Sequence, residues 1–378
     1  MPGAAGSRVW WRPAGLGRPS SGGVMFALPD SWVWDFWVAD DGEQYHLFFL
    51  FASRALGNPD ARHFRASIGH AVSTDLTNWT RVADALVRSD APAFDDVATW
   101  TGSVIRHPDG TWFLFYTGVE LAPWGSNLQR VGYATSSDLV SWTKQGMVAE
   151  ADPRWYESLD GGWHDWAFRD PWVFADPDGN GWHLLVTARG NSGPVDDRGV
   201  VGHCWSPDLR QWEVREPLSQ VGQGFGQLEV LHTAVIDGQG FLIFSCAARD
   251  TASARREVGA GGGTWAARAE SVLGPFDLAH VFLLVGEEVD RVHGVNHHGM
   301  ADLEDQQGAV RCFRTVDAQI VELRTLPDRL ECLAMPLGKG GEAGHENLFL
   351  GTLGSFFLLT RLGDDLPKHR AEIGRAHV

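Results

Sequence analysis

The chain has 378 residues, and 31 Lys and Arg against 48 Asp and Glu give it a formal net charge of −17. That balance argues against a nucleic-acid binder, which needs a basic footprint, and against docking on an anionic membrane surface. With 44% hydrophobic and 21% charged residues, the composition is that of a soluble globular protein, and the length fits two average domains or one large all-β domain.

The N-terminal segment MPGAAGSRVWW lacks the continuous apolar run of a secretory signal. No stretch of the sequence approaches the roughly 20 apolar residues of a membrane-spanning helix. The four cysteines show no zinc-binding spacing and are too few for a disulfide scaffold in so long a chain. We therefore expect a reduced, cytoplasmic protein in which residues 1–24 form an N-terminal extension.

Tight turns punctuate the next 250 residues. Asp and Gly stand between apolar, β-rich runs at residues 40–42, 108–110, 177–179 and 237–238, and this pair favours a β-hairpin because both residues tolerate positive φ. Each hairpin is followed by a copy of one motif: GHAVSTDLTNW at 69–79, GYATSSDLVSW at 132–142, GHCWSPDLRQW at 202–212 and a weaker copy at 265–276. The sequence is therefore built from a repeating β unit.

The unit reads as a strand, a tight turn, two strands, an Asp-Leu-x-x-Trp turn and a further strand. A fifth unit starts near residues 297–301 and continues through 310–314. Units of roughly 60–70 residues built from short strands are typical of β-propeller blades. The sequence predicts an all-β fold with little helix: a five-bladed β-propeller over residues 25–350, then a C-terminal strand and tail at 351–378.

Residues that recur from copy to copy are expected to be structural. An Asp in such a turn accepts bonds from the backbone two residues on, and the Trp is expected to pack between blades. A residue repeated in successive blades seldom performs chemistry that happens once. The residues concerned are Asp75, Asp138, Asp208, Trp79, Trp142 and Trp212.

One polar position per unit differs, at the start of the first strand, where propeller strands line the central channel. These positions are Asp35, Thr101, Asp170, Glu229 and His297, at intervals of 66, 69, 59 and 68 residues. We expect the three carboxylates to meet in an aromatic-lined funnel. An acid, a nucleophile or base and a group that holds substrate are the equipment for breaking glycosidic bonds. A purely structural role stays open for each acid, because a buried carboxylate can also serve as an ion-pair or backbone partner.

Three segments carry a family resemblance. FRDPWVF at 168–174 resembles the Arg-Asp-Pro motif of glycoside hydrolase families 32 and 68, the invertases, fructanases and levansucrase-type fructosyltransferases. TGSV at 101–104, followed by Asp-Gly and by YTG at 116–118, resembles their Ser-Gly-Ser strand and its partner. VWDFW at 33–37 resembles the family 68 nucleophile segment. The resemblance covers roughly residues 30–250.

The resemblance implies a retaining hydrolase or transglycosylase that acts on β-fructofuranosides through a covalent fructosyl-enzyme. It makes Asp35 the nucleophile, Asp170 the stabiliser of the transition state and Glu229 the general acid/base. Glu229 departs from the pattern, because Leu and Val flank it where these families usually carry Pro or Arg. We also expect no C-terminal β-sandwich of the family 32 kind.

Substrate-binding residues are expected around the three acids, and the candidates are Trp34, Trp100, Ser103, Arg169, Gln227, His297 and His298. A structural pair is an equally good interpretation of the two histidines. They lack an evident third ligand, so no metal site is predicted, and no cofactor motif is present. The expected partner is a small-molecule or oligosaccharide substrate, with no nucleic acid and no membrane.

Two alternative functions stay open. An inverting arabinofuranosidase or xylosidase, as in the related family 43, also places three acids on a propeller. A non-catalytic carbohydrate-binding propeller belongs to another class, and distinct polar residues at the inner-strand position argue against it. The separation of the Asp35 and Glu229 carboxyls would distinguish retention, at about 5–5.5 Å, from inversion, at about 6.5–9.5 Å.

Overall fold

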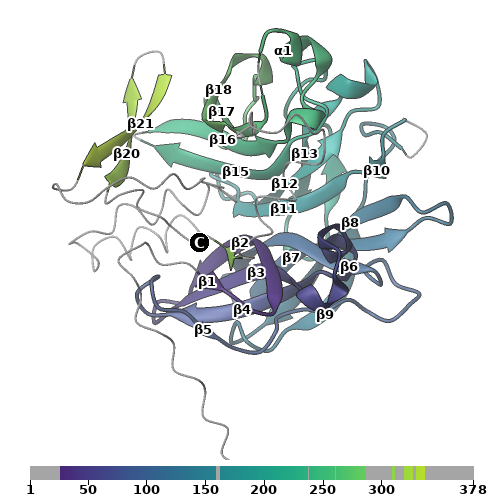
Figure 1. The fold of residues 1–378 in the computed structure, drawn as a ribbon, viewed down its shortest axis with the longest axis vertical. Helices are drawn as coiled ribbons and strands as arrows, with labels where there is room; N and C mark the ends of the chain where they lie inside the picture. Colours follow the sequence, from purple (N-terminus) through teal and green to yellow (C-terminus); the bar gives the residue numbers. More distant parts are fainter. Residues whose placement is uncertain are drawn as a thin grey trace, which may run out of the picture.

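The computed structural model describes residues 26–158, 162–236, 238–259 and 261–286, together with the backbone of three further strands at 309–310, 319–326 and 329–336. The regular secondary structure of the described residues is almost entirely β (Figure 1). Its helical elements are short: α1 (Ser253–Glu257) and the 3-10 turns η1 (Arg54–Leu56), η2 (Pro59–Arg65), η4 (Val195–Asp197), η5 (Ala248–Asp250) and η6 (Leu278–His280). No helix among the described residues has the length and apolarity needed to cross a bilayer.

Four sheets follow one another along the chain as the blades of a propeller, each with four antiparallel strands. The second sheet also contains a short fifth strand, β10 (Asp165–Trp166). Blade 1 contains β2 (Ser31–Asp40), β3 (Tyr45–Ser53), β4 (Ser67–Ser73) and β5 (Thr80–Arg81). Blade 2 contains β6 (Ala98–Arg106), β7 (Trp112–Leu121), β8 (Asn127–Ser136) and β9 (Thr143–Ala149). Blade 3 contains β11 (Phe168–Ala175), β12 (Trp182–Arg189), β13 (Gly199–Ser206) and β14 (Glu213–Arg215). Blade 4 contains β15 (Glu229–Ile236), β16 (Gln239–Cys246), β17 (Gly263–Ala269) and β18 (Val281–Gly286).

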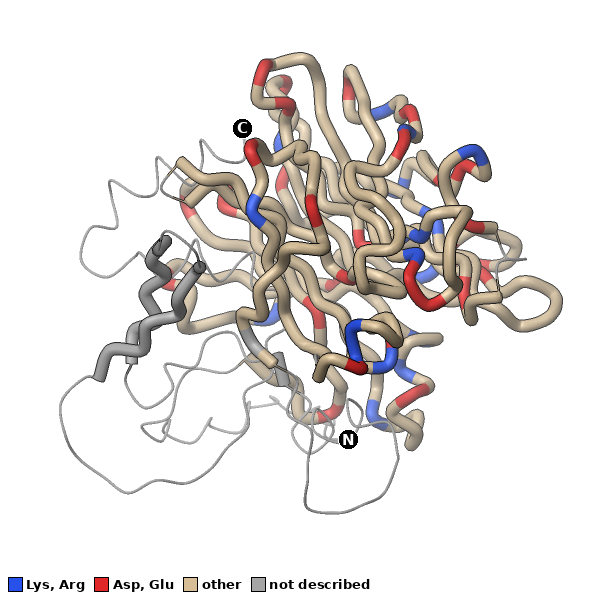
Figure 2. Tube along the Cα trace, turned by 90° about the horizontal axis from the view of Figure 1, so that it is seen from above, with Lys and Arg blue, Asp and Glu red and all other residues tan. Residues whose placement is uncertain are grey.

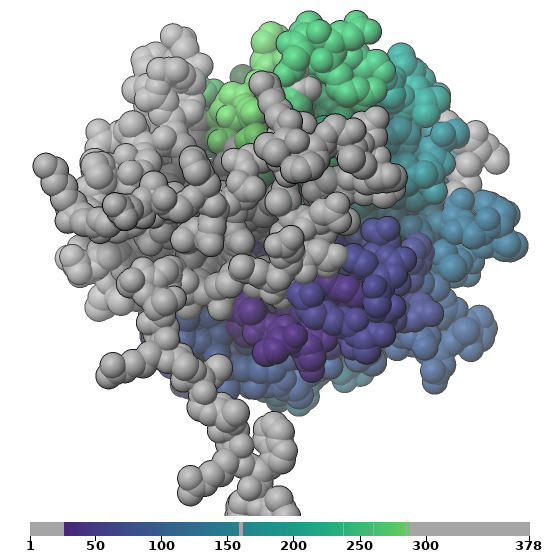
Figure 3. All heavy atoms as spheres, in the orientation of Figure 1, coloured from purple at the N-terminus to yellow at the C-terminus, as the bar shows by residue number. Residues whose placement is uncertain are grey.

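The blades are arranged around the molecule in chain order, from blade 1 in purple to blade 4 in green (Figures 1 and 3). The first strands of neighbouring blades lie next to one another, β2 by β6, β6 by β11 and β11 by β15. The second strands, such as β7, read as continuous apolar runs because both of their faces are covered by neighbouring blades. The outer strand β9 instead alternates exposed and half-buried residues.

The prediction of five blades is wrong. The described strands form four blades, and those beyond residue 286 do not add a fifth four-stranded sheet. Instead, β19 (Ala309–Val310) pairs with β1 (Phe26–Ala27), and β20 (Gln319–Leu326) pairs with β21 (Arg329–Pro336). The expected fifth unit has neither the Asp-Gly turn nor the Asp-Leu-x-x-Trp turn of the first three, so it lacked the local signals that set blade register.

The structural interpretation of the repeated turns is confirmed. Asp75 accepts bonds from the backbone N–H groups of Thr77 and Asn78 at 2.8 and 2.7 Å, and Asp138 and Asp208 repeat the pattern. The motif Leu has positive φ near 60° in all three copies, at Leu76, Leu139 and Leu209.

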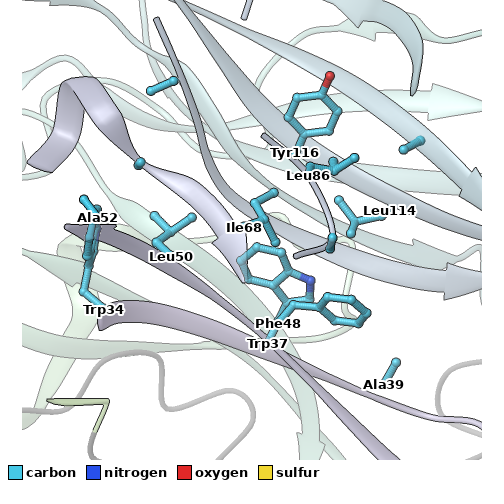
Figure 4. Close-up of a cluster of buried hydrophobic side chains, with 14 of the residues drawn as sticks. Trp34, Trp37, Ala39, Phe48, Leu50, Ala52, Ile68, Leu86, Leu114 and Tyr116 are labelled. Carbon is cyan, nitrogen blue, oxygen red and sulfur yellow. The ribbon is translucent and has the colours of Figure 1, made fainter. Parts of the chain in front are cut away.

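Two of the three motif tryptophans join blades, whereas Trp79 packs against a cluster of blade 1 residues and Phe26. The ring of Trp142 meets Phe48 of blade 1 edge-on at 5.8 Å, and Trp212 meets Phe115 of blade 2 at 5.2 Å. The core between blades 1 and 2 continues inward through Trp37, Ile68 and Leu114 (Figure 4). Blades 1 and 2, and blades 2 and 3, are therefore held together through large buried aromatic area.

Charged residues of both signs are interspersed along the loops that join the strands (Figure 2). The boundaries 1–24, 25–350 and 351–378 stay predictions, as does the expected lack of a β-sandwich, because the terminal segments lie outside the described residues.

Candidate active site

Each inner strand carries a β-bulge at the same height. The register shifts between Trp34 and Phe36 in β2, Trp100 and Gly102 in β6, Arg169 and Trp172 in β11, and Glu229 and His232 in β15. A bulge leaves a residue unpaired and re-aims its side chain, and bulges are frequent next to active sites. Asp35, Thr101 and Asp170 thus stand where the ladder breaks, and Glu229 stands at the edge of the fourth break.

Three of the bulge residues have a strained backbone. The φ angles of Asp35, Asp170 and Val230 are +36°, +55° and +51°, which non-glycine residues rarely adopt. In blades 1 and 3 the strained residue is itself the acid, whereas in blade 4 the strained residue is Val230 and Glu229 immediately precedes it. The surrounding hydrogen bonds must hold these conformations in place.

Asp35 is held by the neighbouring blade. The Thr101 hydroxyl of β6 donates to Asp35 Oδ2 at 2.6 Å. Burial raises the pKa of Asp35, the bond from Thr101 lowers it, and the nearby charge of Glu229 raises it further. Thr101 therefore has a defined function at its predicted position: it favours the ionised form of Asp35.

A second threonine connects the next two bulges. The Thr117 hydroxyl, on β7, donates to the carbonyl of Thr101 at 3.1 Å and accepts the backbone N–H of Asp170 at 2.8 Å. Asp170 Oδ2 in turn accepts the Thr187 hydroxyl at 3.1 Å and the backbone N–H of Val230 at 3.3 Å. The four bulges form one continuous hydrogen-bonded series.

The Asp170 carboxyl is buried. Burial raises its pKa to about 7, while the Arg169 guanidinium opposes the shift and the charges of Asp35 and Glu229 add to it. Arg169 Nε lies 3.4 Å from Asp170 Oδ2. This environment lets the carboxyl exchange its proton near neutral pH.

Arg169 joins two of the acids. Its Nη2 donates to Glu229 Oε1 at 2.6 Å while its Nε faces Asp170. Burial acts to lower the Arg169 pKa, but the surrounding carboxylates raise it, so the group stays charged. Because Asp35 interacts electrostatically with both Asp170 and Glu229, the structure brings the three predicted acids and Arg169 into one cluster.

Glu229 is the accessible acid, with 29% of its side chain exposed. Gln227 Nε2 lies 3.3 Å from Glu229 Oε1 and 3.2 Å from Asp250 Oδ2. A carboxyl that is both reachable and firmly held is suited to exchange protons with a bound molecule.

The family follows from the sequence match. The model of the glycosyl hydrolases family 32 N-terminal domain matches residues 37–271, well over half of the chain. The chain belongs to this family. The matched segment contains Asp170 and Glu229 and begins just after Asp35.

Curated relatives are similar over the same region. The chain is 30% identical over 213 residues to a β-fructofuranosidase, insoluble isoenzyme 3, of Oryza sativa subsp. indica, which covers 53% of this chain and 32% of the relative. It is 29% identical over 185 residues to a sucrose-6-phosphate hydrolase of Bacillus subtilis (strain 168), covering 49% of this chain and 33% of that protein. The chain therefore spans about a third of the length of these relatives.

Solved structures share the fold of this family 32 chain. The inulosucrase of Halalkalicoccus jeotgali superposes with a TM-score of 0.57 at 24% identity, covering 70% of this chain and 74% of that one. The levansucrase of Gluconacetobacter diazotrophicus gives 0.55 at 17% identity, covering 68% and 66%. At these identities the likeness supports the propeller fold alone.

The remaining predicted binding residues of this family 32 protein differ in their placement. Trp34 and Trp100 flank the His63 ring edge-on at 5.8 and 6.2 Å, on the Asp35 side of the cluster. Ser103 donates to the carbonyl of Pro171 at 2.6 Å and accepts the N–H of Val173, so its hydroxyl fixes the strand that carries Asp170. His297 and His298 lie outside the described residues.

Sequence reasoning missed several members of the cluster. Thr117 and Thr187 are each the sixth residue of the second strand of a hairpin, β7 and β12, and that repetition was the available signal. Arg62 belongs to the 3-10 turn η2, and its guanidinium carbon lies 5.2 Å from the centroid of the Trp34 ring. The loop that contains it shows no sequence pattern that could have revealed this contact. Gln129 and Asp250 were likewise missed, because only the fold brings them to Arg169 and Glu229. Within the described residues, no group of three His, Cys, Asp or Glu side chains is placed to hold a metal ion.

Proposed function

We propose that this family 32 protein cleaves β-fructofuranosides with retention of configuration and transfers the fructosyl group to water or to a sugar hydroxyl. The observation that carries the proposal is the single cluster in which Asp35, Asp170 and Glu229 meet around Arg169. Family membership and the β-fructofuranosidase relatives support it. Inverting and non-catalytic alternatives gain no support from these relatives.

In the first step, the Asp35 carboxylate attacks the anomeric carbon of the fructosyl unit. The bond from that carbon to the glycosidic oxygen breaks, and Glu229 gives its proton to the departing oxygen. The products are a covalent fructosyl ester on Asp35, a free alcohol and an ionised Glu229. The Thr101 hydroxyl favours the ionised nucleophile that this step requires.

In the second step, Glu229 takes a proton from water or from an acceptor hydroxyl, whose oxygen attacks the anomeric carbon. The ester bond to Asp35 breaks and the carboxylate is regenerated. Asp170 and Arg169 would hold the ring hydroxyls of the fructosyl unit throughout. Two displacements at one carbon retain its configuration.

The test is NMR of fresh reaction mixtures with sucrose, with short fructans and with an aryl arabinofuranoside. Initial release of β-fructose, or a new fructosyl transfer product, is expected. Initial formation of an inverted sugar would contradict the covalent intermediate, and no turnover of any furanoside would contradict catalysis.

Removal of the nucleophile gives a sharper test. Asp35→Asn keeps the size of the side chain and its contact with Thr101 but cannot form the ester, so kcat should fall by a factor on the order of 10³ or more. Sugar binding, followed by tryptophan fluorescence, should persist. Turnover close to that of the wild type would overturn the assignment of Asp35.

The cytoplasmic location and the exclusion of nucleic-acid and membrane partners stay predictions from the sequence.

A further inference from the structure

One strand departs from the four-strand plan of the blades. The two-residue strand β10 (Asp165–Trp166) lies between blades 2 and 3 and pairs in parallel with the start of β8, whereas the strand pairs within the blades are antiparallel. Its register sets Asp165 opposite Asn127. Asp165 stands four residues before Arg169, so the extra strand delivers a carboxylate to the back of the active-site cluster.

Asp165 takes part in a closed triangle of buried polar groups. Gln129 Nε2 donates to Asp165 Oδ2 at 3.0 Å, and Arg169 Nη1 donates to Gln129 Oε1 at 2.9 Å. Arg169 Nη1 also lies 3.7 Å from Asp165 Oδ2. Only 8% of the Asp165 side chain is exposed. A buried guanidinium requires a counter-ion, and at Nη1 it has one that solvent hardly reaches.

The other end of the guanidinium meets a different kind of partner. Arg169 Nη2 donates to Glu229, which is accessible and which the proposed reaction must protonate and deprotonate in every cycle. Whenever Glu229 carries a proton, Arg169 loses that ion pair. The catalytic cycle would then leave a buried cation without an anion on this side, at a high energetic cost, unless another carboxylate balances it.

We propose that Asp165 is a positioning residue: it is the constant counter-ion of Arg169 and keeps the guanidinium in place while Glu229 gains and loses its proton. The inference rests on the proposed function. It also explains the role of the extra strand β10, which places Asp165 next to Arg169. Gln129 joins the two groups and sets their separation.

Removal of the Asp165 charge should make the protonated form of Glu229 harder to reach. Arg169 would then be balanced on this side mainly by Glu229 itself, and the ion pair would favour the charged carboxylate. His164, largely exposed, lies 3.5 Å from Asp165. The other charged and titratable groups that interact with this cluster are Asp35, Arg62, His63, Asp170, Arg189, Arg249 and Asp250. They are identical in all the variants below.

The experiment is the pH dependence of kcat/KM and of kcat on sucrose for the wild type, Asp165→Asn and the double variant Asp165→Asn with Gln129→Glu. In Asp165→Asn, the alkaline half-maximum should move down by about 1 pH unit, because a neighbouring charge has been lost. The fall should be mainly in kcat, about 10-fold at the wild-type optimum, with KM little changed.

The double variant moves the carboxylate instead of removing it. The carboxylate introduced by Gln129→Glu would present an oxygen where Gln129 Oε1 now accepts from Arg169, and the amide introduced by Asp165→Asn would donate back to that carboxylate. The wild-type pH profile should return. A merely structural defect would not be repaired by moving the charge.

Asp176→Asn is the matched control. Asp176 is also a mostly buried carboxylate, paired with His183 at 2.9 Å outside the cluster, so its loss should leave the pH profile unchanged. An unshifted profile in Asp165→Asn, or a double variant that stays shifted, would overturn the inference. If Asp165→Asn does not fold, as judged by circular dichroism, the double variant still decides between the two outcomes. A wild type without turnover overturns the proposed function and this inference together, whereas an active wild type with an unshifted Asp165→Asn overturns the inference alone.

Discussion

At the scale of single residues, the protonation of the clustered carboxyl groups depends on a balance between burial and neighbouring donors. Asp35 and Asp170 sit in strained bulges where burial raises the pKa of each, and specific donors work against that shift. A protein accepts such unfavourable local arrangements where chemistry requires them. Two substitutions test the balance, one by activity and one by stability.

Thr101→Val tests the donor to Asp35, the proposed nucleophile. Because the Thr101 bond lowers the pKa of Asp35, its removal should raise that pKa and move the acidic limb of the kcat/KM profile to higher pH. Activity at low pH should fall about 10-fold. The pH–rate profile on sucrose is the measurement, and Thr101→Ser, which keeps the hydroxyl, should restore it. An unchanged acidic limb in Thr101→Val would contradict the assignment.

Asp170→Asn tests the buried carboxyl through stability. The pKa of Asp170 rises from 3.8 to about 7 on folding, so between these values the folded state binds more protons than the unfolded state. Stability must therefore decrease as pH rises from about 4 to 7. Asn removes this cost. The free energy of unfolding of the variant should therefore increase relative to that of the wild type as pH rises, by at most about 4 kcal/mol at pH 8. Thermal melts from pH 4 to pH 8 measure the difference, and a gain that does not grow with pH would refute the idea.

At the scale of elements, the Asp-Leu-x-x-Trp turn fixes the link between the third and fourth strands of a blade. In blade 2, Asp138 accepts the N–H groups of Val140 and Ser141 at 2.9 and 2.7 Å, and these bonds lower its pKa to about 2. The turn also holds Leu139 at positive φ. The carboxylate therefore accepts hydrogen bonds from backbone N–H groups in the turn, as a capping side chain does at the start of a helix.

Asp138→Ala should lower the free energy of unfolding by about 1 kcal/mol, as the loss of a helix cap does. Asp138→Asn keeps an acceptor oxygen, so its free energy of unfolding should fall by less. The native pKa is depressed, so the difference between wild type and Asp138→Ala should be present at neutral pH and fade as pH falls towards 2. Urea unfolding at pH 7 and pH 3 provides the comparison. Equal losses at both pH values would argue against a role for the charge.

At the scale of the whole molecule, blades are joined by aromatic residues that insert into the next sheet. Trp212 of blade 3 packs edge-on against Phe115 of blade 2, and its indole N–H donates to the Leu209 carbonyl at 3.1 Å. The same arrangement joins Trp142 to Phe48 one blade earlier. Since the candidate active site lies where the inner strands converge, its geometry depends on these contacts.

Trp212→Ala should therefore destabilise the protein by about 3 kcal/mol, as the loss of a large packed aromatic does. Urea unfolding followed by circular dichroism is the measurement. Trp124→Ala is the control, because Trp124 is 68% exposed and its loss should change stability by less than about 0.5 kcal/mol. Similar effects of the two changes would show that the motif tryptophan does not join the blades.

The local features of this protein could be predicted from the sequence because they depend on nearby residues. Asp-Gly pairs and the Asp-Leu-x-x-Trp turns determine hairpins and register, so the β class, the repeat and the first four blades were predictable. Asp35, Thr101 and Asp170 were found because a polar residue breaks the repeat at each inner-strand bulge, and Glu229 because it stands beside the fourth.

Only the tertiary structure decided the rest, because it depends on segments that meet through space. The strands beyond residue 286 carry apolar, β-forming sequence, but their pairing partners are not encoded locally, and the predicted fifth blade was therefore wrong. The threonine that joins two bulges, the guanidinium shared by two acids and the parallel strand that delivers Asp165 combine residues from different blades. No pattern along one strand can contain a contact between blades, which is why the acids, Thr101 and Arg169 were visible in the sequence and the contacts through which they affect one another's charge were not.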